Sequence, residues 1–384
     1  MLSRFSQEEV SKARIMVVGC GALGNEVVKN LVMMGVQHLV LVDFDYVEPD
    51  NLSRSVWFNK EDAQAGRYKV EAMADKLRLL HPEIEVRTIN GDIAYDVGLG
   101  LIRQMDVIIG CVDNRWARYC INRLCMRADK PWVDGGIDGL EGTARVFMPG
   151  ENCYACNLGP EGLKDLSRRM PCAGIIRRNV EAGKAPTTSI VASIIGAVQV
   201  QEALKLIQDS RFKIQDPGFK DEKDWTSLCG KMFYYEGQHL STKLVDFKAW
   251  DDDCAVHECW EPVRQTTITT QTTVAEALQQ LKSELHATEV SFSLTDDCFV
   301  DYVVSRNNDS RREVMKPGRA VASFVEEDKE LRGMTFSNLY QHEWKEIDNK
   351  FPYQQLTLGE LGLPKQAVLN VQTEDNNYYI ELNN

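Results

Sequence analysis

The chain of 384 residues is long enough for two domains that each bury a sizeable core, and a hydrophobic share of 43% fits a globular protein. Its formal charge of −13 argues against a broad nucleic-acid or anionic-membrane surface, because both need clustered Lys and Arg. No apolar run approaches the roughly 20 residues that span a bilayer, and the start of the chain lacks the apolar core of a signal peptide, so we expect a cytoplasmic protein.

Strand-like and helix-like segments alternate from Arg14 to Ile137. The first is a buried strand at 14–19, followed by a helix with Val27, Val28 and Leu31 on one face. Strand-like segments then occur at 38–45, 85–90, 105–113 and 130–137, and helical ones at 69–82 and 115–130. This alternation predicts an α/β fold of the doubly wound, Rossmann-like type, with a mainly parallel sheet and helices on both faces.

The pattern changes after Gly150. Residues 151–184 are predicted to form a long exposed loop, and 187–207 a strong helix that is apolar on much of its circumference and therefore buried. A polar insertion and a strand-rich segment at 231–250 follow. A linker at 261–271 marks the expected end of the first domain, which we place at residues 1–260.

A small α+β module is predicted at residues 265–384. Thr273 and Glu276 have the spacing of a capping box ahead of a helix, and Val290 and Phe292 alternate as in a half-buried strand. Two short strands around an Asp-Asn-Asn turn at 375–377 close the chain.

A glycine loop lies between the first strand and the first long helix. Gly19, Gly21 and Gly24 satisfy GxGxxG, which lets backbone N–H groups and the helix N-terminus approach a phosphate. Asp43 ends the second strand, where a carboxylate can accept hydrogen bonds from ribose hydroxyls. Dinucleotide-dependent dehydrogenases share both features, so these residues alone do not separate hydride transfer from ATP chemistry.

The residues that follow favour a triphosphate. Adenylation needs cations that neutralise the α-phosphate and the departing pyrophosphate, and a carboxylate that holds Mg²⁺, whereas hydride transfer needs no such cluster. Taken singly, these charges could be ordinary surface residues. The groups suited to ATP and Mg²⁺ are Asn51, Arg54, Lys69, Asp113 and Asn114.

From about Ser11 to Gln201 the chain resembles the MoeB/ThiF and ubiquitin-activating enzyme superfamily. The motifs that carry the resemblance are the glycine loop, D-x-D with Asp43 and Asp45, N-L-x-R, G-x-x-K-V, and D-N after a strand. It implies that the residues matching Asp43, Arg54, Lys69 and Asp113 bind ATP and Mg²⁺. The substrate it implies is the C-terminal glycine of a ubiquitin-like protein.

The resemblance also implies a homodimer. Relatives begin with a segment whose arginine reaches the other subunit's ATP, and Arg4 is the candidate here. The compact single-chain layout resembles activating enzymes of bacterial ubiquitin-like conjugation systems.

A metal site is predicted from two separated groups of cysteines. Cys153 and Cys156 have the CxxC spacing with which two thiolates bind one tetrahedral Zn²⁺. In the resembling family a second CxxC completes a structural zinc site. The aligned spacing here reads Cys254 to His257, with Cys259 as the competing fourth ligand.

Cys172 is the candidate nucleophile, in a loop at about 157–186. Five basic residues surround it in sequence, and such charge raises the thiolate fraction of a cysteine; they are Arg168, Arg169, Arg177, Arg178 and Lys184. In ubiquitin-activating enzymes a corresponding loop carries the thiol that takes the modifier from AMP. The alternative is that Cys172 is incidental, because some sulfur-carrier activators stop at the adenylate.

Residues 355–382 resemble the closing part of the ubiquitin-fold (β-grasp) domain with which activating enzymes recruit a conjugating enzyme. The resulting hypothesis is adenylation of a ubiquitin-like protein, thioester formation on Cys172 and transfer to a conjugating enzyme. The alternative is a MoeB/ThiF-type adenylyltransferase for a sulfur-carrier protein, without a thioester. A noncatalytic scaffold is a third reading, against which the set of ATP-site residues argues.

Overall fold

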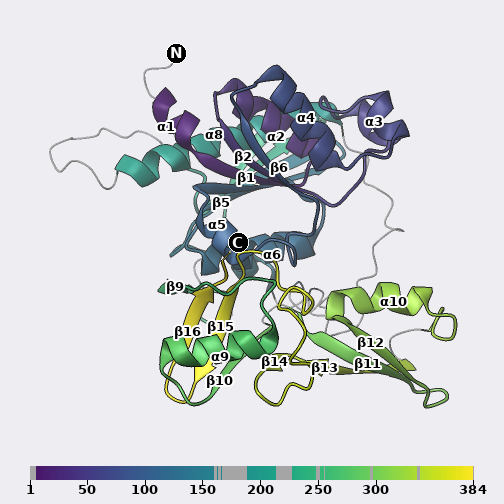
Figure 1. Cartoon of the computed structure of the whole chain (residues 1–384). Helices are drawn as coiled ribbons and strands as arrows, with labels where there is room; N and C mark the ends of the chain where they lie inside the picture. Colours follow the sequence, from purple (N-terminus) through teal and green to yellow (C-terminus); the bar gives the residue numbers. More distant parts are fainter. Residues whose placement is uncertain are drawn as a thin grey trace. The chain divides into compact units, whose positions relative to one another are not determined.

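The computed structural model (Figure 1) divides into two compact units. The first draws on Met1–Ile93, Ile102–Gly159 and Ala182–Cys259, and the second on Ala94–Leu101, Pro160–Glu181 and Trp260–Asn384. The structure describes residues 6–159, 162, 166, 188–212, 227–247, 251–254, 256–294, 297–334 and 338–383.

An eight-stranded sheet forms the centre of the first unit. Its order is β3-β2-β1-β4-β5-β6-β7-β8. The strands from β3 to β5 pair in parallel, and those from β5 to β8 pair antiparallel. The bounds are β1 Arg14–Val18, β2 His38–Val42, β3 Glu85–Ile89, β4 Val107–Gly110, β5 Trp132–Asp138, β6 Glu141–Phe147, β7 Lys231–Glu236 and β8 Ser241–Asp246.

The predicted doubly wound, Rossmann-like α/β fold with parallel strands is thus confirmed for this unit. β6 lies in no predicted element, although the buried Ala144 and Val146 alternate there with the half-buried Thr143 and Arg145. It forms an antiparallel hairpin with β5, and its pairing with β7 carries the antiparallel part of the sheet.

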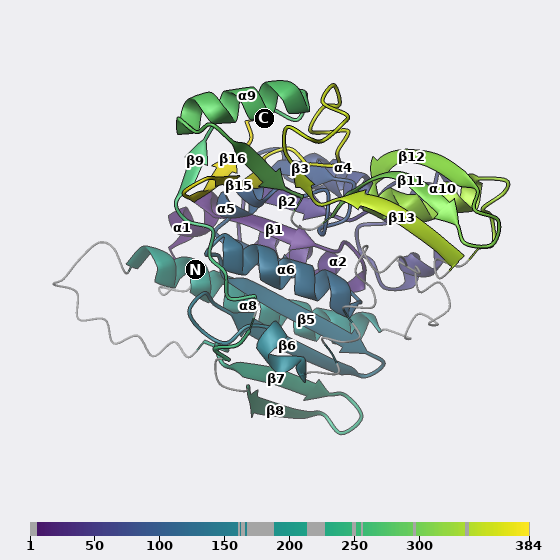
Figure 2. The same ribbon diagram turned by 90° about the horizontal axis from the view of Figure 1, so that it is seen from below.

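Helices cover both faces of this sheet, as the alternation predicts. Right-handed crossovers place helices on opposite faces when the chain winds outward first one way from β1 and then the other. Figure 2 shows α6 on one face and α2 and α8 on the other. The bounds are α1 Gln7–Lys12, α2 Ala22–Met33, η1 Pro49–Ser53, α3 Lys60–Gln64, α4 Lys69–Leu80, α5 Leu99–Arg103, α6 Arg115–Arg127, η2 Ala155–Asn157 and α8 Ser189–Phe212.

Helix α8 is a core helix. Its segment Ser189–Gln208 has a mean hydropathy of 1.6, long and apolar enough to meet the length and composition of a membrane span. The expectation that no apolar run approaches that length is therefore wrong. Yet 61% of the segment is buried, and Val191, Ile195 and Leu204 belong to the main core of the first unit. Packing against α2 and the sheet accounts for its apolar surface.

The second unit contains a five-stranded sheet of order β14-β10-β15-β16-β9 and a three-stranded sheet of order β12-β11-β13. The capping box of Thr273 and Glu276 begins α9, as predicted, and the last two strands form the predicted hairpin. β9 lies within the segment 261–271 that the sequence predicts to be a linker. The bounds are β9 Val263–Gln265, α9 Val274–Leu285, β10 Val290–Ser293, β11 Phe299–Ser305, β12 Arg311–Pro317, η4 Gly318–Ala320, α10 Val321–Glu327, β13 Leu339–Trp344, β14 Glu346–Ile347, β15 Val368–Thr373 and β16 Asn377–Glu381.

The second unit also includes Ala94–Leu101, a segment that the sequence places in the first domain. The Gly100 amide donates to the Gln366 carbonyl over 2.9 Å, and an Arg319 nitrogen lies 3.6 Å from an Asp96 oxygen. Tyr95 and Val97 are buried. The unit is therefore built from two separate parts of the chain, and removing residues 265–384 would strip its partners from this segment.

A buried ion cluster joins β5, β6 and α6. The fully buried Asp134 accepts a hydrogen bond from Arg118 Nε at 2.9 Å and also pairs with Arg145. The Arg118 Nη2 group donates to the carbonyls of Val112 and Gly135 at 2.6 and 3.0 Å. Because Asp134 compensates two desolvated guanidinium groups, its loss would leave both without a counter-ion.

We predict that Asp134→Ala lowers the free energy of unfolding by about 3–5 kcal/mol, the cost of uncompensated buried charge. Chemical denaturation measures this change. Asp138→Ala, at the exposed end of the same strand, is the matched control and should change stability by less than about 0.5 kcal/mol. Equal effects of the two substitutions would show that the cluster does not stabilise the fold.

Candidate functional site

The glycine loop turns tightly between β1 and α2. Gly19 has φ +93°, and a Cβ there would lie 2.6 Å from the Cys111 carbonyl oxygen. A Cβ on Gly24 would overlap the Gly19 carbonyl. Gly21 precedes the first turn of α2, and nothing lies within 4 Å of the position of its Cβ. The loop thus packs closely against the protein at Gly19 and Gly24 and leaves open space at Gly21, at the N-terminus of α2. This open space suits the approach of a phosphate.

A buried asparagine fixes this loop. Asn25 Nδ2 donates to the carbonyls of Cys20 and Gly21, both at 2.9 Å, and Oδ1 accepts from the Trp57 amide at 2.9 Å. Trp57 Nε1 in turn donates to the Asn25 carbonyl at 3.1 Å. These bonds join the glycine loop to the segment that follows Arg54. Neither Asn25 nor Trp57 was predicted from the sequence as part of the site, because a hydrogen bond between buried polar groups follows no periodic pattern.

Asp43 ties the end of β2 to the glycine loop. Its Oδ2 accepts from the Cys20 amide at 2.6 Å, and its Oδ1 accepts from the Asp45 amide at 2.8 Å. Burial raises the pKa of Asp43, and the charge of Lys69 and the two amide bonds oppose this rise. The carboxylate is thus held beside the loop, where a ribose would lie.

Lys69, the first residue of α4, pairs with Asp45. Its Nζ lies 2.8 Å from Asp45 Oδ2, and its amide donates to the Asp45 carbonyl at 2.9 Å. The residue is only 7% exposed. Burial lowers the pKa of Lys69, but the charges of Asp43 and Asp45 outweigh burial and the pKa is raised overall. The ammonium therefore stays charged at neutral pH, as an electrostatic partner of phosphate must.

The other predicted ATP-site residues lie on neighbouring loops. The buried Asn51 accepts from the Glu48 amide at 3.0 Å and shapes η1, and Arg54 at the end of η1 donates to the Asp50 carbonyl at 3.1 Å. Asp113 is exposed after β4, and Asn114 beside it caps α6 by accepting from the Ala117 amide at 2.8 Å. Asn51 and Asn114 thus have structural bonds that the sequence did not suggest.

The glycine loop, Asp43 and Asp113 follow β1, β2 and β4, three adjacent parallel strands. Their carboxyl ends share one edge of the sheet, at the point where the strand order reverses. Ligands of open α/β sheets bind at that switch point. Asp43 thus contacts the glycine loop where a nucleotide is expected, and Lys69 pairs with Asp45 on the loop that follows Asp43.

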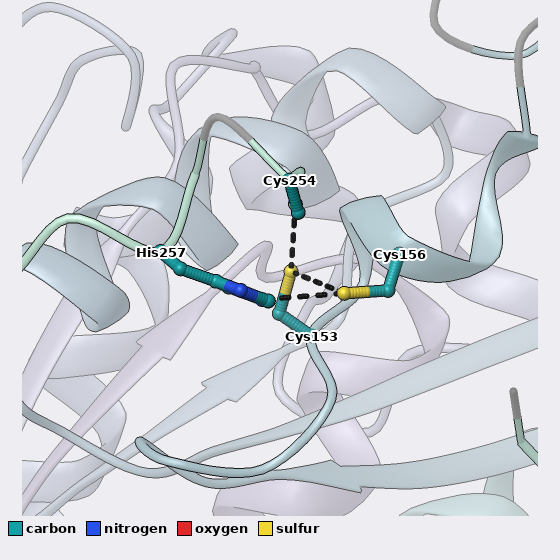
Figure 3. Close-up of side chains that lie close together, drawn as sticks. All are labelled: Cys153, Cys156, Cys254 and His257. Carbon is teal, nitrogen blue, oxygen red and sulfur yellow. Dashed lines mark hydrogen bonds between the residues drawn. The ribbon is translucent and has the colours of Figure 1, made fainter. Parts of the chain in front are cut away.

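Four side chains form a compact metal-binding group (Figure 3). The ligand atoms of Cys153, Cys156, Cys254 and His257 all lie within 4.8 Å of one another. The Sγ atom of Cys153 is 3.6 Å from that of Cys156 and 3.8 Å from that of Cys254, and Cys156 Sγ is 3.2 Å from His257 Nε2.

This arrangement fits a tetrahedral ion, because Zn–S bonds of about 2.3 Å place two ligand sulfurs about 3.8 Å apart. Burial raises the pKa of Cys153 to about 12, so the thiol keeps its proton unless a cation compensates the thiolate. Burial lowers the pKa of His257, which favours the neutral, ligating imidazole. His257 rather than the exposed Cys259 belongs to the group, so the geometry favours the first of the two predicted ligands.

Two predicted residues, Arg4 and Cys172, lie outside the described residues, as does most of the loop at 157–186. Their roles stay predictions.

Comparison with known proteins bears directly on this site. The ThiF family model matches residues 2–256, which include the whole eight-stranded sheet and the site at its edge. The chain belongs to the ThiF family.

Curated relatives of this ThiF protein include several adenylyltransferases. It is 34% identical over 204 residues to the molybdopterin-synthase adenylyltransferase of Salmonella typhimurium, covering 52% of this chain and 75% of that protein. It is 28% identical over 250 residues to the SAMP-activating enzyme E1 of Haloferax volcanii, covering 65% and 82%. It is 29% identical to the maize adenylyltransferase and sulfurtransferase MOCS3-1, covering 65% of this chain but only 47% of the maize protein.

A crystal structure of E. coli MccB with succinimide is 21% identical to this chain, and the match covers 65% of this chain and 67% of the MccB chain with a TM-score of 0.49.

The family match ends at residue 256, so the two sheets of the second unit lie beyond it.

We predict one zinc ion per chain in protein purified without chelators, measured by plasma emission spectrometry. Because metal-binding energy is folding energy at such a site, Cys153→Ser should lose the zinc and lower the Tm by at least several degrees. Cys229→Ser, at a half-buried cysteine outside the group, is the matched control and should keep the metal. Wild-type protein without zinc would contradict the assignment.

Proposed function

We propose that this ThiF-family protein uses ATP and Mg²⁺ to adenylate the C-terminal carboxylate of a ubiquitin-like or sulfur-carrier protein. One observation carries the proposal: a buried, charged Lys69 and the Asp43 carboxylate lie at the glycine loop, where the parallel strands end. A nicotinamide site has no need of that ammonium, whereas transfer of an adenylyl group to a carboxylate builds charge on the α-phosphate and the pyrophosphate.

The proposed site residues have different roles in that reaction. The loop of Gly19, Gly21 and Gly24 and the N-terminus of α2 would contact phosphate, and Asp43 the ribose. The Gly19 amide itself donates to the Val42 carbonyl at 2.8 Å, so Gly19 contributes the tight turn rather than a donor. Lys69 and Arg54 would neutralise the α-phosphate and the leaving pyrophosphate. Asp113 would hold Mg²⁺, with Asp45, Asn51 and Asn114 supporting the surrounding loops.

We predict ATP–pyrophosphate exchange that requires both Mg²⁺ and the cognate carrier protein. Asp113→Ala should lower the exchange rate by about a hundredfold or more, since it removes the proposed metal ligand at a charge-stabilising site. Asp246→Ala, an exposed carboxylate in the edge strand β8, is the matched control and should leave the rate unchanged. Exchange by a folded Asp113→Ala variant at the wild-type rate would refute the role of Asp113.

We further propose that the modifier is transferred from AMP to Cys172 as a thioester and passes to a conjugating enzyme recruited by the second unit. The basic sequence around Cys172 supports the first part, because positive charge stabilises the attacking thiolate. In the second unit, α9 packs on the five-stranded sheet, and the first and last strands of that sheet along the chain, β9 and β16, pair in parallel. This arrangement is compatible with a β-grasp domain. The printed name of the Haloferax relative, an activating enzyme E1, favours the same reading.

The alternative is an adenylyltransferase for a sulfur-carrier protein that forms no thioester. The printed name of the Salmonella relative, a molybdopterin-synthase adenylyltransferase, favours it. Both readings share the adenylation step, a structural zinc ion and the homodimer in which Arg4 would reach the partner's ATP.

The thioester separates the two readings. After incubation with ATP and the modifier, we expect an adduct that survives denaturing electrophoresis and is lost with a reducing thiol. Cys172→Ala should abolish the adduct and keep pyrophosphate exchange, because adenylation precedes transfer. Cys259→Ala removes another cysteine, one exposed in the structure, and should change neither result. Wild-type exchange without any adduct would favour the adenylyltransferase.

A further inference from the structure

Two tyrosines flank the ion pair of Lys69 and Asp45. Tyr46 directly follows Asp45, and Tyr68 directly precedes Lys69. Their ring centroids are 4.3 Å apart with an interplanar angle of 26°, and the Tyr46 hydroxyl donates to the Tyr68 hydroxyl at 2.8 Å. The two segments therefore meet through both rings and both hydroxyls.

The backbones of the same segments pair on either side of the rings. The Lys69 amide donates to the Asp45 carbonyl at 2.9 Å, and the Val47 amide donates to the Arg67 carbonyl at 2.8 Å. Tyr46 and Tyr68 form an isolated antiparallel bridge between them. Asn90, which follows β3, also hydrogen-bonds the Tyr68 hydroxyl. The start of α4 is thereby joined to the loops after β2 and β3.

Burial explains only the Tyr68 half of this ring pair. Tyr68 is half-buried and packs against the main core of the first unit, whereas Tyr46 is 48% exposed and its ring removes little apolar surface from water. Lys69, by contrast, is 7% exposed, and its position follows from the segment that Tyr68 begins. The contact of Tyr46 with Tyr68 therefore adds little to the core, and it joins the loop after β2 to the residue that directly precedes Lys69.

We propose that Tyr46 and Tyr68 are positioning residues that hold Lys69 at the nucleotide phosphates. The inference rests on the proposed ATP site. Binding of a phosphate requires the ammonium to shift from Asp45 or to share its protons with the new partner. The ring pair and the two backbone bonds keep the first turn of α4 in place during that exchange, so only the lysine side chain has to move.

ATP binding tests the proposal without any carrier protein. In titration calorimetry with ATP and Mg²⁺, Tyr46→Ala should weaken binding by about tenfold, because small misplacements of a positioned group have large effects. In a Lys69→Ala background the same substitution should have almost no further effect, since the rings act through the lysine. Tyr46→Phe, which keeps the stack, should have an intermediate effect. Tyr234→Ala, in β7 four strands away from β1, is the matched control.

Labelling of Lys69 provides a second, ligand-free measurement. Tyr46→Ala should raise the rate of acetylation of Lys69, measured by mass spectrometry, several-fold over wild type at an unchanged Tm, and Tyr234→Ala should not. Additive losses of ATP binding in the Tyr46→Ala, Lys69→Ala double variant, or unchanged labelling, would overturn the proposal. Absence of ATP binding by the wild-type protein would instead refute the proposed function, while the labelling result would still test the ring pair.

Discussion

The hydrogen bond from the Cys20 amide to the Asp43 carboxylate is the contact on which the site depends. It joins the ends of β1 and β2, and the second oxygen of Asp43 orders Asp45, which in turn pairs with Lys69. One carboxylate thus connects the glycine loop, through Asp45, to Lys69 at the start of α4. Because a carboxylate in this environment needs partners for both oxygens, the loop after β2 has little freedom to take another course.

The local parts of this fold were predictable from sequence. The period of apolar residues located the parallel strands and the long helices, and the capping box of Thr273 and Glu276 located α9. β6, β9 and the three-stranded sheet β12-β11-β13 were not predicted, because their pairing depends on strands already in place. The inclusion of Ala94–Leu101 in the second unit was equally invisible, since it follows from contacts with residues more than two hundred positions away.

The same distinction holds for the sites. CxxC spacing identified Cys153 and Cys156, and the family resemblance added Cys254 with either His257 or Cys259. The structure brings His257 into the group. The glycine loop, Asp43 and Lys69 were also named in advance, but the pairing of Lys69 with Asp45 was not. Asn25, Trp57 and the cluster around Asp134 were missed, since hydrogen bonds between buried polar groups leave no periodic trace in a sequence.

The proposed function requires the carboxyl edge of the parallel strands to bind ATP rather than a nicotinamide dinucleotide. Titration calorimetry of the full chain with ATP and Mg²⁺, and separately with NAD, compares the two ligands at the same glycine loop. We expect ATP to bind, Lys69→Ala to weaken this binding by at least about tenfold, and NAD not to bind. Binding of NAD with no measurable binding of ATP would contradict it.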